Sequence, residues 1–213
     1  MTEGEARLWL EQHHAVPRET FQKLERYVEI LLAGMSEQNL IAESTRDHVW
    51  ARHIVDSAQL LPLAIKAGEG AWVDLGSGAG LPAVVMAILS PRPVMMIESR
   101  RKRIDFLNQA ISELRLSNAS VFGGRVETVD PMDAAVISAR AYAPLPRLLE
   151  SARHLSTDRT IWVLPKGRNA ENELEAARST WQGVFHVERS VTDLDSAIIV
   201  AHSVASRGRK GRG

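Results

Sequence analysis

The chain of 213 residues contains no cysteine, which excludes disulfides, zinc sites with cysteine ligands and a cysteine nucleophile. It also has no apolar run of the length that a membrane span needs, about 18 residues or more. The first residues, MTEGEARLWLEQHH, lack the basic start and apolar stretch of a secretory signal. We therefore expect a cytoplasmic protein with no membrane segment and no bound metal.

Net charge is also absent, because 26 basic residues balance 26 acidic ones. A protein that grips naked nucleic acid over a wide surface is usually basic overall. The distribution is uneven, with 7 basic and 11 acidic side chains in residues 1–70 and 15 of each in residues 71–205. The last eight residues, SRGRKGRG, carry 4 basic side chains and no acidic one. We expect residues 206–213 to form a flexible basic tail that either frays in solvent or contacts phosphates.

Residues 1–68 have the apolar spacing of helices, with Pro17 separating two of them and a third predicted from Trp50 to Ile65. No strand pattern occurs before Gly70. The sequence therefore predicts an N-terminal helical extension over residues 1–68, packed on a core domain formed by residues 69–205.

Strands and helices alternate in that core domain. Strands are predicted at 71–75, 94–98, 119–124, 133–138, 160–167, 184–191 and 196–204, and helices at 81–89, 101–114, 145–155 and 169–180. Such alternation predicts an α/β fold, with a mostly parallel sheet covered by helices on both faces. Since no helix separates the last two strands, we expect them to form an antiparallel hairpin at one edge.

A glycine-rich segment, Val-Asp-Leu-Gly-Ser-Gly-Ala-Gly-Leu-Pro over residues 73–82, joins the first strand to the first helix of the core. Dinucleotide-binding loops space their glycines as G-x-G-x-x-G. Here the third glycine comes one residue early, at Gly80, and Leu81 stands where that pattern needs glycine. The segment resembles instead the first motif of the Rossmann-like class I methyltransferases, which bind S-adenosylmethionine. An acidic loop suits the positive amine and sulfonium of that cofactor. We expect Asp74, Gly76 and Gly78 to bind it.

The end of the second predicted strand carries Glu98, 22 residues after Gly76. An acid at this place accepts the ribose hydroxyls of nucleotide cofactors. The alternative is a charge that merely faces solvent. The basic run Arg100–Arg103 follows at a helix start, and the sequence does not separate a solvated face from an RNA-contacting one.

The chemistry of methyl transfer limits which atom of a substrate this chain could methylate. Methylation of pyrimidine C5 needs a thiolate, which this chain lacks. Enzymes that methylate exocyclic amines usually carry an Asn/Asp-Pro-Pro-Tyr/Phe motif after the fourth strand, where this chain has Ser-Ala-Arg-Ala-Tyr with Arg140. A nucleophile that needs no deprotonation, such as guanine N7, fits such a site. Catalysis then consists of in-line placement and exclusion of water.

From about Tyr27 to Val204 the chain resembles the RsmG (GidB) family, the bacterial 16S rRNA (guanine-527-N7) methyltransferases. The motifs that carry the resemblance are Asn-Leu-Ile at 39–41, Arg-His-Ile-Val-Asp-Ser at 52–57, the glycine-rich segment, Lys-Arg-Ile-Asp-Phe-Leu at 102–107, Gly-Arg-Val-Glu at 124–127, Ser-Ala-Arg-Ala at 138–141 and Leu-Pro-Lys-Gly at 164–167. Ile41 and Ala83 depart from the family pattern, which usually has Thr and Gly at these positions.

The resemblance implies roles for individual residues. Gly76 and Leu81 contact the cofactor, and Val126 and Glu127 border its adenine. Arg140 reaches cofactor or substrate, where it would hold guanine O6, a phosphate or the cofactor carboxylate, but not N7. The implied substrate is 16S rRNA within the small ribosomal subunit or an assembly intermediate, and we expect the enzyme to act as a monomer.

Other polar residues have two interpretations each. His53 and Ser57 either form part of the active-site wall or are buried polar groups of a helix. Arg52 and Asp56, four residues apart, either belong to the same wall or only form a pair on the helix surface. Lys166 either contacts an RNA phosphate, so that with Arg140 and His53 it positions the substrate, or is solvated at a strand end.

Two other functions compete with rRNA methylation. The N-terminal helices could be the lid of a small-molecule methyltransferase, which the neutral net charge favours slightly. The chain could also be a non-catalytic module in ribonucleoprotein assembly, but the intact cofactor motif argues against this. An NAD-dependent oxidoreductase fails on the glycine spacing.

Overall fold

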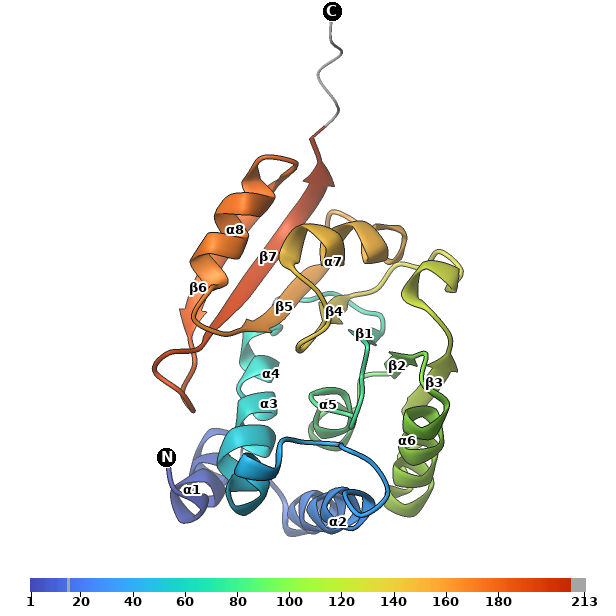
Figure 1. Ribbon diagram of the computed structural model, residues 1–213, viewed down its shortest axis with the longest axis vertical. Helices are drawn as coiled ribbons and strands as arrows, with labels where there is room; N and C mark the ends of the chain where they lie inside the picture. The colour runs from blue at the N-terminus through green and yellow to red at the C-terminus, as the bar shows by residue number, and fades with distance from the viewer. Residues whose placement is uncertain (15, 208–213) are drawn as a thin grey trace, which may run out of the picture.

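A computed structural model describes residues 1–14 and 16–207 of the chain (Figure 1). Its centre is a seven-stranded sheet in the order β3-β2-β1-β4-β5-β7-β6. The strands are β1 (Trp72–Leu75), β2 (Val94–Glu98), β3 (Ala119–Gly123), β4 (Val136–Ser138), β5 (Ile161–Lys166), β6 (Trp181–Arg189) and β7 (Ala197–Ser206). The first five strands are parallel, whereas β7 pairs antiparallel with β5 and β6. This arrangement confirms the predicted parallel sheet with an antiparallel edge hairpin.

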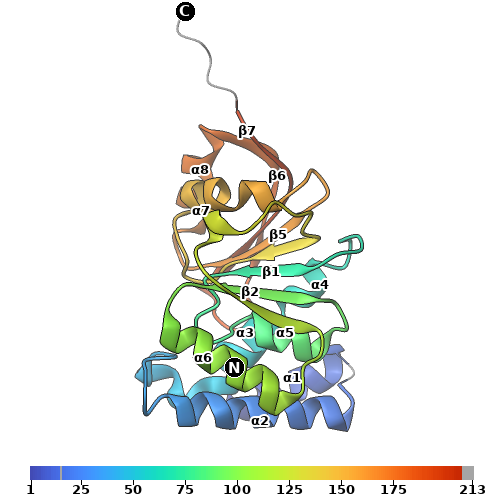
Figure 2. The ribbon, with the colours of Figure 1, turned by 90° about the vertical axis from the view of Figure 1, so that its right-hand side faces the viewer.

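The helices cover both faces of the sheet, as Figure 2 shows. They are α1 (Glu3–His14), α2 (Arg18–Gly34), η1 (Glu43–His48), η2 (Trp50–Val55), α3 (Asp56–Ala58), α4 (Leu60–Leu63), α5 (Ala83–Leu89), α6 (Arg101–Leu114), η3 (Val126–Thr128), α7 (Leu145–Ala152), η4 (Arg153–Leu155) and α8 (Ala170–Arg178). None of these helices is both long and apolar enough to cross a membrane, within the part of the chain that the structure describes.

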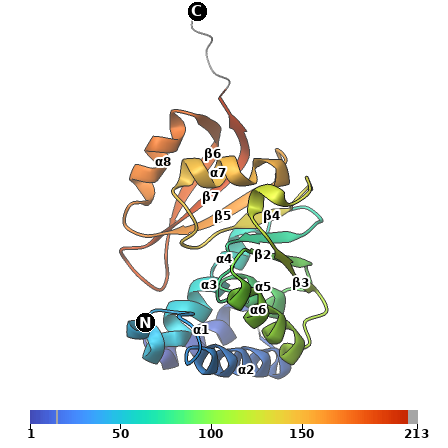
Figure 3. The same cartoon turned by 45° about the vertical axis from the view of Figure 1, so that its right-hand side comes forward.

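Two hydrophobic clusters lie on opposite faces of the sheet. One contains the N-terminal helices with α5 and α6, and the other contains α7 and α8 (Figure 3). Strand β1 alternates between them, because Trp72 belongs to the first cluster and Val73 and Leu75 to the second. Asp74 therefore points toward the face that the N-terminal helices cover.

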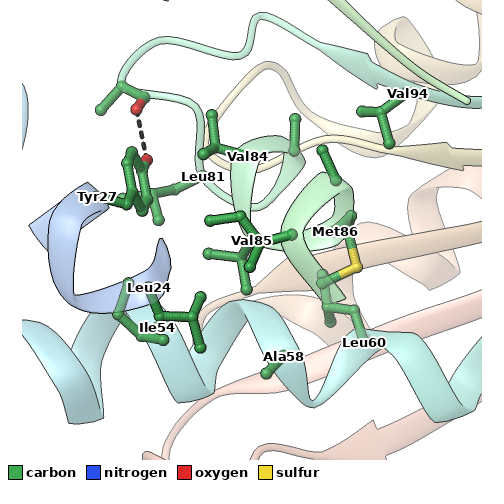
Figure 4. Close-up of a cluster of buried hydrophobic side chains, with 14 of the residues drawn as sticks. Leu24, Tyr27, Ile54, Ala58, Leu60, Leu81, Val84, Val85, Met86 and Val94 are labelled. Atoms are coloured by element: carbon green, nitrogen blue, oxygen red, sulfur yellow. Dashed lines mark hydrogen bonds between the residues drawn. The ribbon is translucent and has the colours of Figure 1, made fainter. Parts of the chain in front are cut away.

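The N-terminal helices support the glycine-rich loop directly. In Figure 4, Tyr27 of α2 reaches the loop, where its buried hydroxyl donates a hydrogen bond of 2.7 Å to the carbonyl of Ala79. Gly80 is packed so closely that a Cβ there would lie 2.5 Å from Val84 Cγ2. The loop is thus packed between Tyr27 of the N-terminal extension and Val84 of α5.

The predicted helix from Trp50 to Ile65 begins differently from the expectation. Its first part, η2, is wound as a π-helix, in which hydrogen bonds close at i→i+5. The carboxylate of Glu3 in α1 accepts hydrogen bonds from the amides of Trp50 and Ala51, so a distant helix fixes the start of this segment. Apolar spacing does not reveal such a tertiary contact.

The predicted tail begins two residues too early. Ser206 still belongs to β7, and Arg207 is tied to the sheet by bonds from its backbone N to Thr180 O (2.8 Å) and from its Nε to Trp181 O (3.1 Å). The remainder of the basic tail lies outside the described residues.

Candidate active site

Three adjacent clefts open where the parallel strands end, the place where open α/β sheets bind ligands. The β2–β3 cleft, of about 530 Å³, is lined by Gly76, Glu98, Arg100, Val126, Glu127 and Tyr142 among others. The glycine-loop cleft, of about 540 Å³, includes His53, Gly76, Gly78, Leu81, Glu98 and Arg140. The hairpin cleft, of about 500 Å³, includes Arg52, Asp56, Arg140, Tyr142, Lys166 and Asp193.

The glycine-rich loop requires its glycines. Gly76 and Gly78 have φ angles of 65° and 57°, in the left-handed region that side chains rarely adopt. A Cβ on Gly76 would lie 2.7 Å from the ring of Tyr142, and one on Gly78 would lie 2.9 Å from Arg103 Nη1. Both glycines line the glycine-loop cleft, as the sequence predicts for cofactor-binding residues.

The carboxylate of Glu98 is fixed between the two cofactor-side clefts. Its Oε2 accepts a hydrogen bond from the amide of Gly78 (2.9 Å), and its Oε1 accepts bonds from the amides of Ser99 and Arg100. A carboxylate offers about four acceptor sites. In this arrangement Glu98 therefore has room for one ribose hydroxyl, rather than the pair that the sequence suggests.

Asp74 differs from the predicted cofactor contact, because its side chain is 1% exposed and lines none of the three clefts. Its Oδ1 accepts a hydrogen bond of 2.6 Å from Ser138, whereas its Oδ2 is buried without a partner among the described residues. Burial raises the pKa of Asp74 to about 6. A direct contact between Asp74 and a ligand in these clefts is therefore not expected, and its binding role stays a prediction.

The other predicted cofactor residues lie at cleft walls. Val126 and Glu127 line the β2–β3 cleft beside Glu98, and Leu81 lines the glycine-loop cleft. Val126 is buried, whereas Glu127 is exposed and pairs with Arg125 at 3.5 Å.

The loop between β4 and α7 carries a residue that the sequence analysis missed, Tyr142. Its ring rests on Gly76 and lines all three clefts, and the preceding Ala141 has a φ of 51°. The available signal was an aromatic residue directly after a strand that ends at the site. Tyr142 lies where the two cofactor-side clefts meet.

Arg140, in the same loop, lines both the glycine-loop cleft and the hairpin cleft. Its Nη2 donates to His53 Nδ1 at 3.0 Å, and more weakly to the carbonyl of Arg52 at 3.4 Å. Its Nη1 lies 3.8 Å from Asp56 Oδ2 and has no hydrogen-bond partner among the described residues. The guanidinium is thus anchored on one side only.

His53 is held neutral in a defined tautomer. Because the hydroxyl of Thr45 donates to Ala42 O at 2.7 Å, it accepts from His53 Nε2–H at 2.8 Å, which leaves Nδ1 free to accept from Arg140. Burial, together with the nearby Arg140 and Arg52, lowers the pKa of His53 to about 3. His53 is therefore a wall and a support for Arg140, which reconciles the two interpretations of this residue.

Lys166 lines the hairpin cleft but has partners within the protein. Its Nζ donates to Ala143 O at 2.9 Å and to Glu173 Oε2 at 2.8 Å. The same Glu173 oxygen accepts from the amide of Leu145, so the pair clamps the loop that carries Tyr142. Its contact with an RNA phosphate stays a prediction.

Of the two interpretations of Arg52 and Asp56, the surface pair is wrong, and both residues line the hairpin cleft. Arg52 pairs with Asp193 at 2.8 Å, whereas Asp56 turns toward Arg140 and the loop between β6 and β7. Tertiary contacts with the loop between β6 and β7 thus replace the local pair. Within residues 1–14 and 16–207, no cluster of three or more His, Asp or Glu could hold a metal ion.

The two cofactor-side clefts fit S-adenosylmethionine. They meet at Gly76, Glu98 and Tyr142, so an elongated ligand can extend from one into the other. Near the loop, two buried atoms of opposite charge form no hydrogen bond with the residues that the structure describes, Asp74 Oδ2 and Arg140 Nη1. The buried charge of Asp74 suits the cationic ammonium and sulfonium of this ligand.

Comparison with known proteins also indicates a methyltransferase. The model of a family described as rRNA small subunit methyltransferase G matches residues 20–199. A ribosomal RNA small subunit methyltransferase G from Rhizorhabdus wittichii is 51% identical, over 100% of this chain and 98% of its own. The Sphingopyxis alaskensis protein of that name is 49% identical, over 99% of this chain and 90% of its own.

Solved structures share the fold at low identity. A SAM-dependent methyltransferase from Aquifex aeolicus matches with a TM-score of 0.60 at 12% identity, covering 81% of this chain and 98% of its own. The M. jannaschii TYW2 structure in complex with AdoMet matches with a TM-score of 0.53 at 15% identity, over 72% and 77%. The fold is therefore the Rossmann-like methyltransferase fold, and the chain belongs to the rRNA small subunit methyltransferase G family.

Proposed function

We propose that this protein transfers a methyl group from S-adenosylmethionine to N7 of guanine 527 in 16S rRNA, acting as a cytoplasmic monomer on small ribosomal subunit particles. The observation that carries the proposal is the position of Arg140, which lines both a cleft built on the glycine-rich loop and a second, separate cleft. A cofactor in the first and a base in the second would meet at this residue.

The cofactor supplies an electrophilic methyl group on a sulfonium, and the residues of this chain provide its position and its surroundings. Glu98 would accept a ribose hydroxyl, Val126 would border the adenine, and the charge of Asp74 would favour the cationic end. Tyr142 would separate the reacting atoms from water at the junction of the clefts.

A nucleophile that needs no base fits this site. His53 is neutral and has both ring nitrogens engaged, so it offers no free acceptor for a proton. Guanine N7 presents a lone pair at neutral pH, and the remaining requirement is alignment with the methyl group.

The proposal is tested by incubating the protein and S-adenosylmethionine with small-subunit particles and, at the same salt concentration, with protein-free 16S rRNA. Because the chain has no net charge, we expect weak binding to naked RNA and faster methylation of the particles. Equal rates on both would refute the preference for particles, and no methyl transfer to either would refute the proposed function.

A further inference from the structure

Asp56 presents a free carboxylate oxygen to the hairpin cleft. It follows the π-helix directly, and its side chain is 19% exposed. Its Oδ1 accepts hydrogen bonds from Thr192 Oγ1 at 2.7 Å and from Gln59 Nε2 at 2.9 Å. Oδ2 receives no hydrogen bond from any residue that the structure describes, and the nearby Arg140 Nη1, at 3.8 Å, is too distant to donate one.

The orientation of this carboxylate is fixed from two directions. Gln59, which holds Oδ1, is itself bound through its Oε1 to the amide of Val191 at 2.9 Å. Thr192 belongs to the same β6–β7 loop. The helical segment and the loop therefore lock one oxygen of Asp56 and leave the other as an acceptor in the cleft.

The groups around the cleft follow the order of the groups on a guanine edge. Gly76 lines both cofactor-side clefts, and Arg140 lines the glycine-loop cleft and the hairpin cleft. Of the three clefts, Asp56 lines only the hairpin cleft. Around guanine, the N7 acceptor is followed by the O6 acceptor and then by the N1–H and N2 amine donors. If N7 faces the cofactor, O6 faces the guanidinium and the donor edge faces Asp56.

We propose that Asp56 is a specificity-determining residue, whose Oδ2 accepts hydrogen bonds from N1–H and the exocyclic N2 amine of the target guanine. This inference rests on the proposed function and extends it to the recognition of the base. A carboxylate is a suitable partner, because it accepts two donors at once and its charge strengthens both bonds.

The same arrangement rejects adenine at two points. Adenine carries an amine where guanine has O6, so two donors would meet at Arg140. Its N1 carries a lone pair, which would face the carboxylate of Asp56. Such repulsive contacts discriminate between bases as effectively as attractive ones.

Asp56 also offsets the positive charge that develops on the purine beside Arg140. The N7 lone pair forms the new N–CH₃ bond while the S–CH₃ bond breaks with its electron pair left on sulfur, so the positive charge passes to the purine and no proton is released. A guanidinium beside this purine is unfavourable unless a carboxylate offsets it. The N1–H donor becomes stronger as charge develops, so its bond to Asp56 stabilises the transition state more than the ground state.

The test crosses one change in the protein with one change in the base. Small-subunit particles reconstituted with guanine or with inosine at position 527 present the base with and without the N2 amine. The parent protein is expected to prefer guanine by about tenfold or more in kcat/KM, as loss of a hydrogen bond to a charged group implies. In Asp56→Ala this preference should fall to within about twofold, since no partner for the amine remains.

Two further variants complete the design. Asp56→Asn keeps the size of the side chain and serves if Asp56→Ala does not fold. Its Oδ1 is expected to keep the bonds from Thr192 and Gln59, so its amide presents donors to the cleft and the guanine preference is again lost. Asp195→Asn changes an exposed acid of the same loop, which lines none of the three clefts, and should keep the parent preference.

The outcomes separate the two proposals. If Asp56→Ala or a folded Asp56→Asn retains the parent preference for guanine over inosine, Asp56 does not contact the base edge. A loss of S-adenosylmethionine affinity in both variants would also contradict the proposed recognition of the base, because such a loss would show that Asp56 has a structural role instead. If the parent protein methylates neither particle, the proposed function fails and this inference fails with it.

Discussion

The ring of His53 and the guanidinium of Arg140 form one unit, in which Nδ1 accepts a hydrogen bond of 3.0 Å from Nη2. Because Thr45 fixes the other ring nitrogen, the histidine keeps this acceptor directed at the arginine. The unit stands between the cofactor side of the site and the hairpin cleft. The position of Arg140 therefore depends on a residue 87 positions earlier in the chain.

We expect Arg140→Lys to lose about 100-fold in methyl transfer to small-subunit particles, the order of loss that misplacement of reacting groups causes. Lysine keeps the charge, but its single ammonium group cannot donate to His53 and at the same time present further donors to the cleft, as the planar guanidinium does. His53→Ala should have a similar effect, and the double variant should be little worse than either single one. Steady-state kinetics measures this, and parent rates for both Arg140→Lys and Arg140→Ala would show that Arg140 is outside the site.

Cofactor binding should be linked to the ionisation of Asp74. Its pKa is raised to about 6, so below this pH the free protein carries a protonated, uncharged Asp74. A cationic ligand favours the charged form and lowers the pKa, so binding near pH 6 releases a proton. Affinity should rise by up to about tenfold from pH 5 to pH 7 and then level off.

Calorimetry in two buffers of different ionisation enthalpy measures this proton release. Asp74→Asn should bind the cofactor more weakly at pH 7.5 and should lack the change between pH 5 and 7. His53 does not interfere, because its pKa of about 3 lies below this range. If the apparent binding enthalpy at pH 6 is the same in both buffers, the charge of Asp74 does not contribute.

Gly76→Ala should weaken cofactor binding and reduce stability by about 1–2 kcal/mol, since its φ of 65° strains any side chain. The added Cβ would also push Tyr142 away from its place at the junction of the clefts. Gly68→Ala is the matched control, because a Cβ there meets nothing within 4 Å. Isothermal calorimetry and thermal unfolding test this, and a Gly76→Ala protein with parent affinity would contradict it.

Lys166→Met and Glu173→Gln should reduce kcat to a similar extent, because either change opens the clamp on the loop that carries Tyr142. The salt dependence of particle binding should stay unchanged. Glu175→Gln, an exposed change on the same helix, should behave as the parent protein. If Lys166 contacts a phosphate instead, Lys166→Met alone will reduce the slope of log affinity against log salt by about one.

Much of the architecture could be predicted, because strand and helix periods are local properties of the sequence. The hairpin of β6 and β7 follows from two strand patterns with no helix between them. The π-helical winding could not be predicted, since its start is fixed by Glu3, some 47 residues away. The pairing of Arg52 with Asp193 depends on the position of the distant β6–β7 loop.

The site was predictable where backbone conformation dictates the residue. The left-handed conformation at Gly76 and Gly78 requires glycine, so the motif in the sequence marks the loop that lines the cleft. The burial of Asp74 follows from alternation along β1, which puts it on the same face as the core residue Trp72, and its role toward the cofactor stays a prediction. The partners of Lys166 depend on how α8 and the loop after β4 meet at the end of β5, which no local pattern records.

The most direct test of the central claim locates the methyl group itself. 16S rRNA is recovered from small-subunit particles after reaction with the protein and S-adenosylmethionine, and fragments are mapped by mass spectrometry and by chemical cleavage at N7-methylguanosine. We predict a single new methyl group, at N7 of guanine 527, with the parent protein and a strongly reduced signal with Arg140→Ala. A methyl group on another atom or nucleotide, or none from a protein that binds the cofactor, would contradict the account.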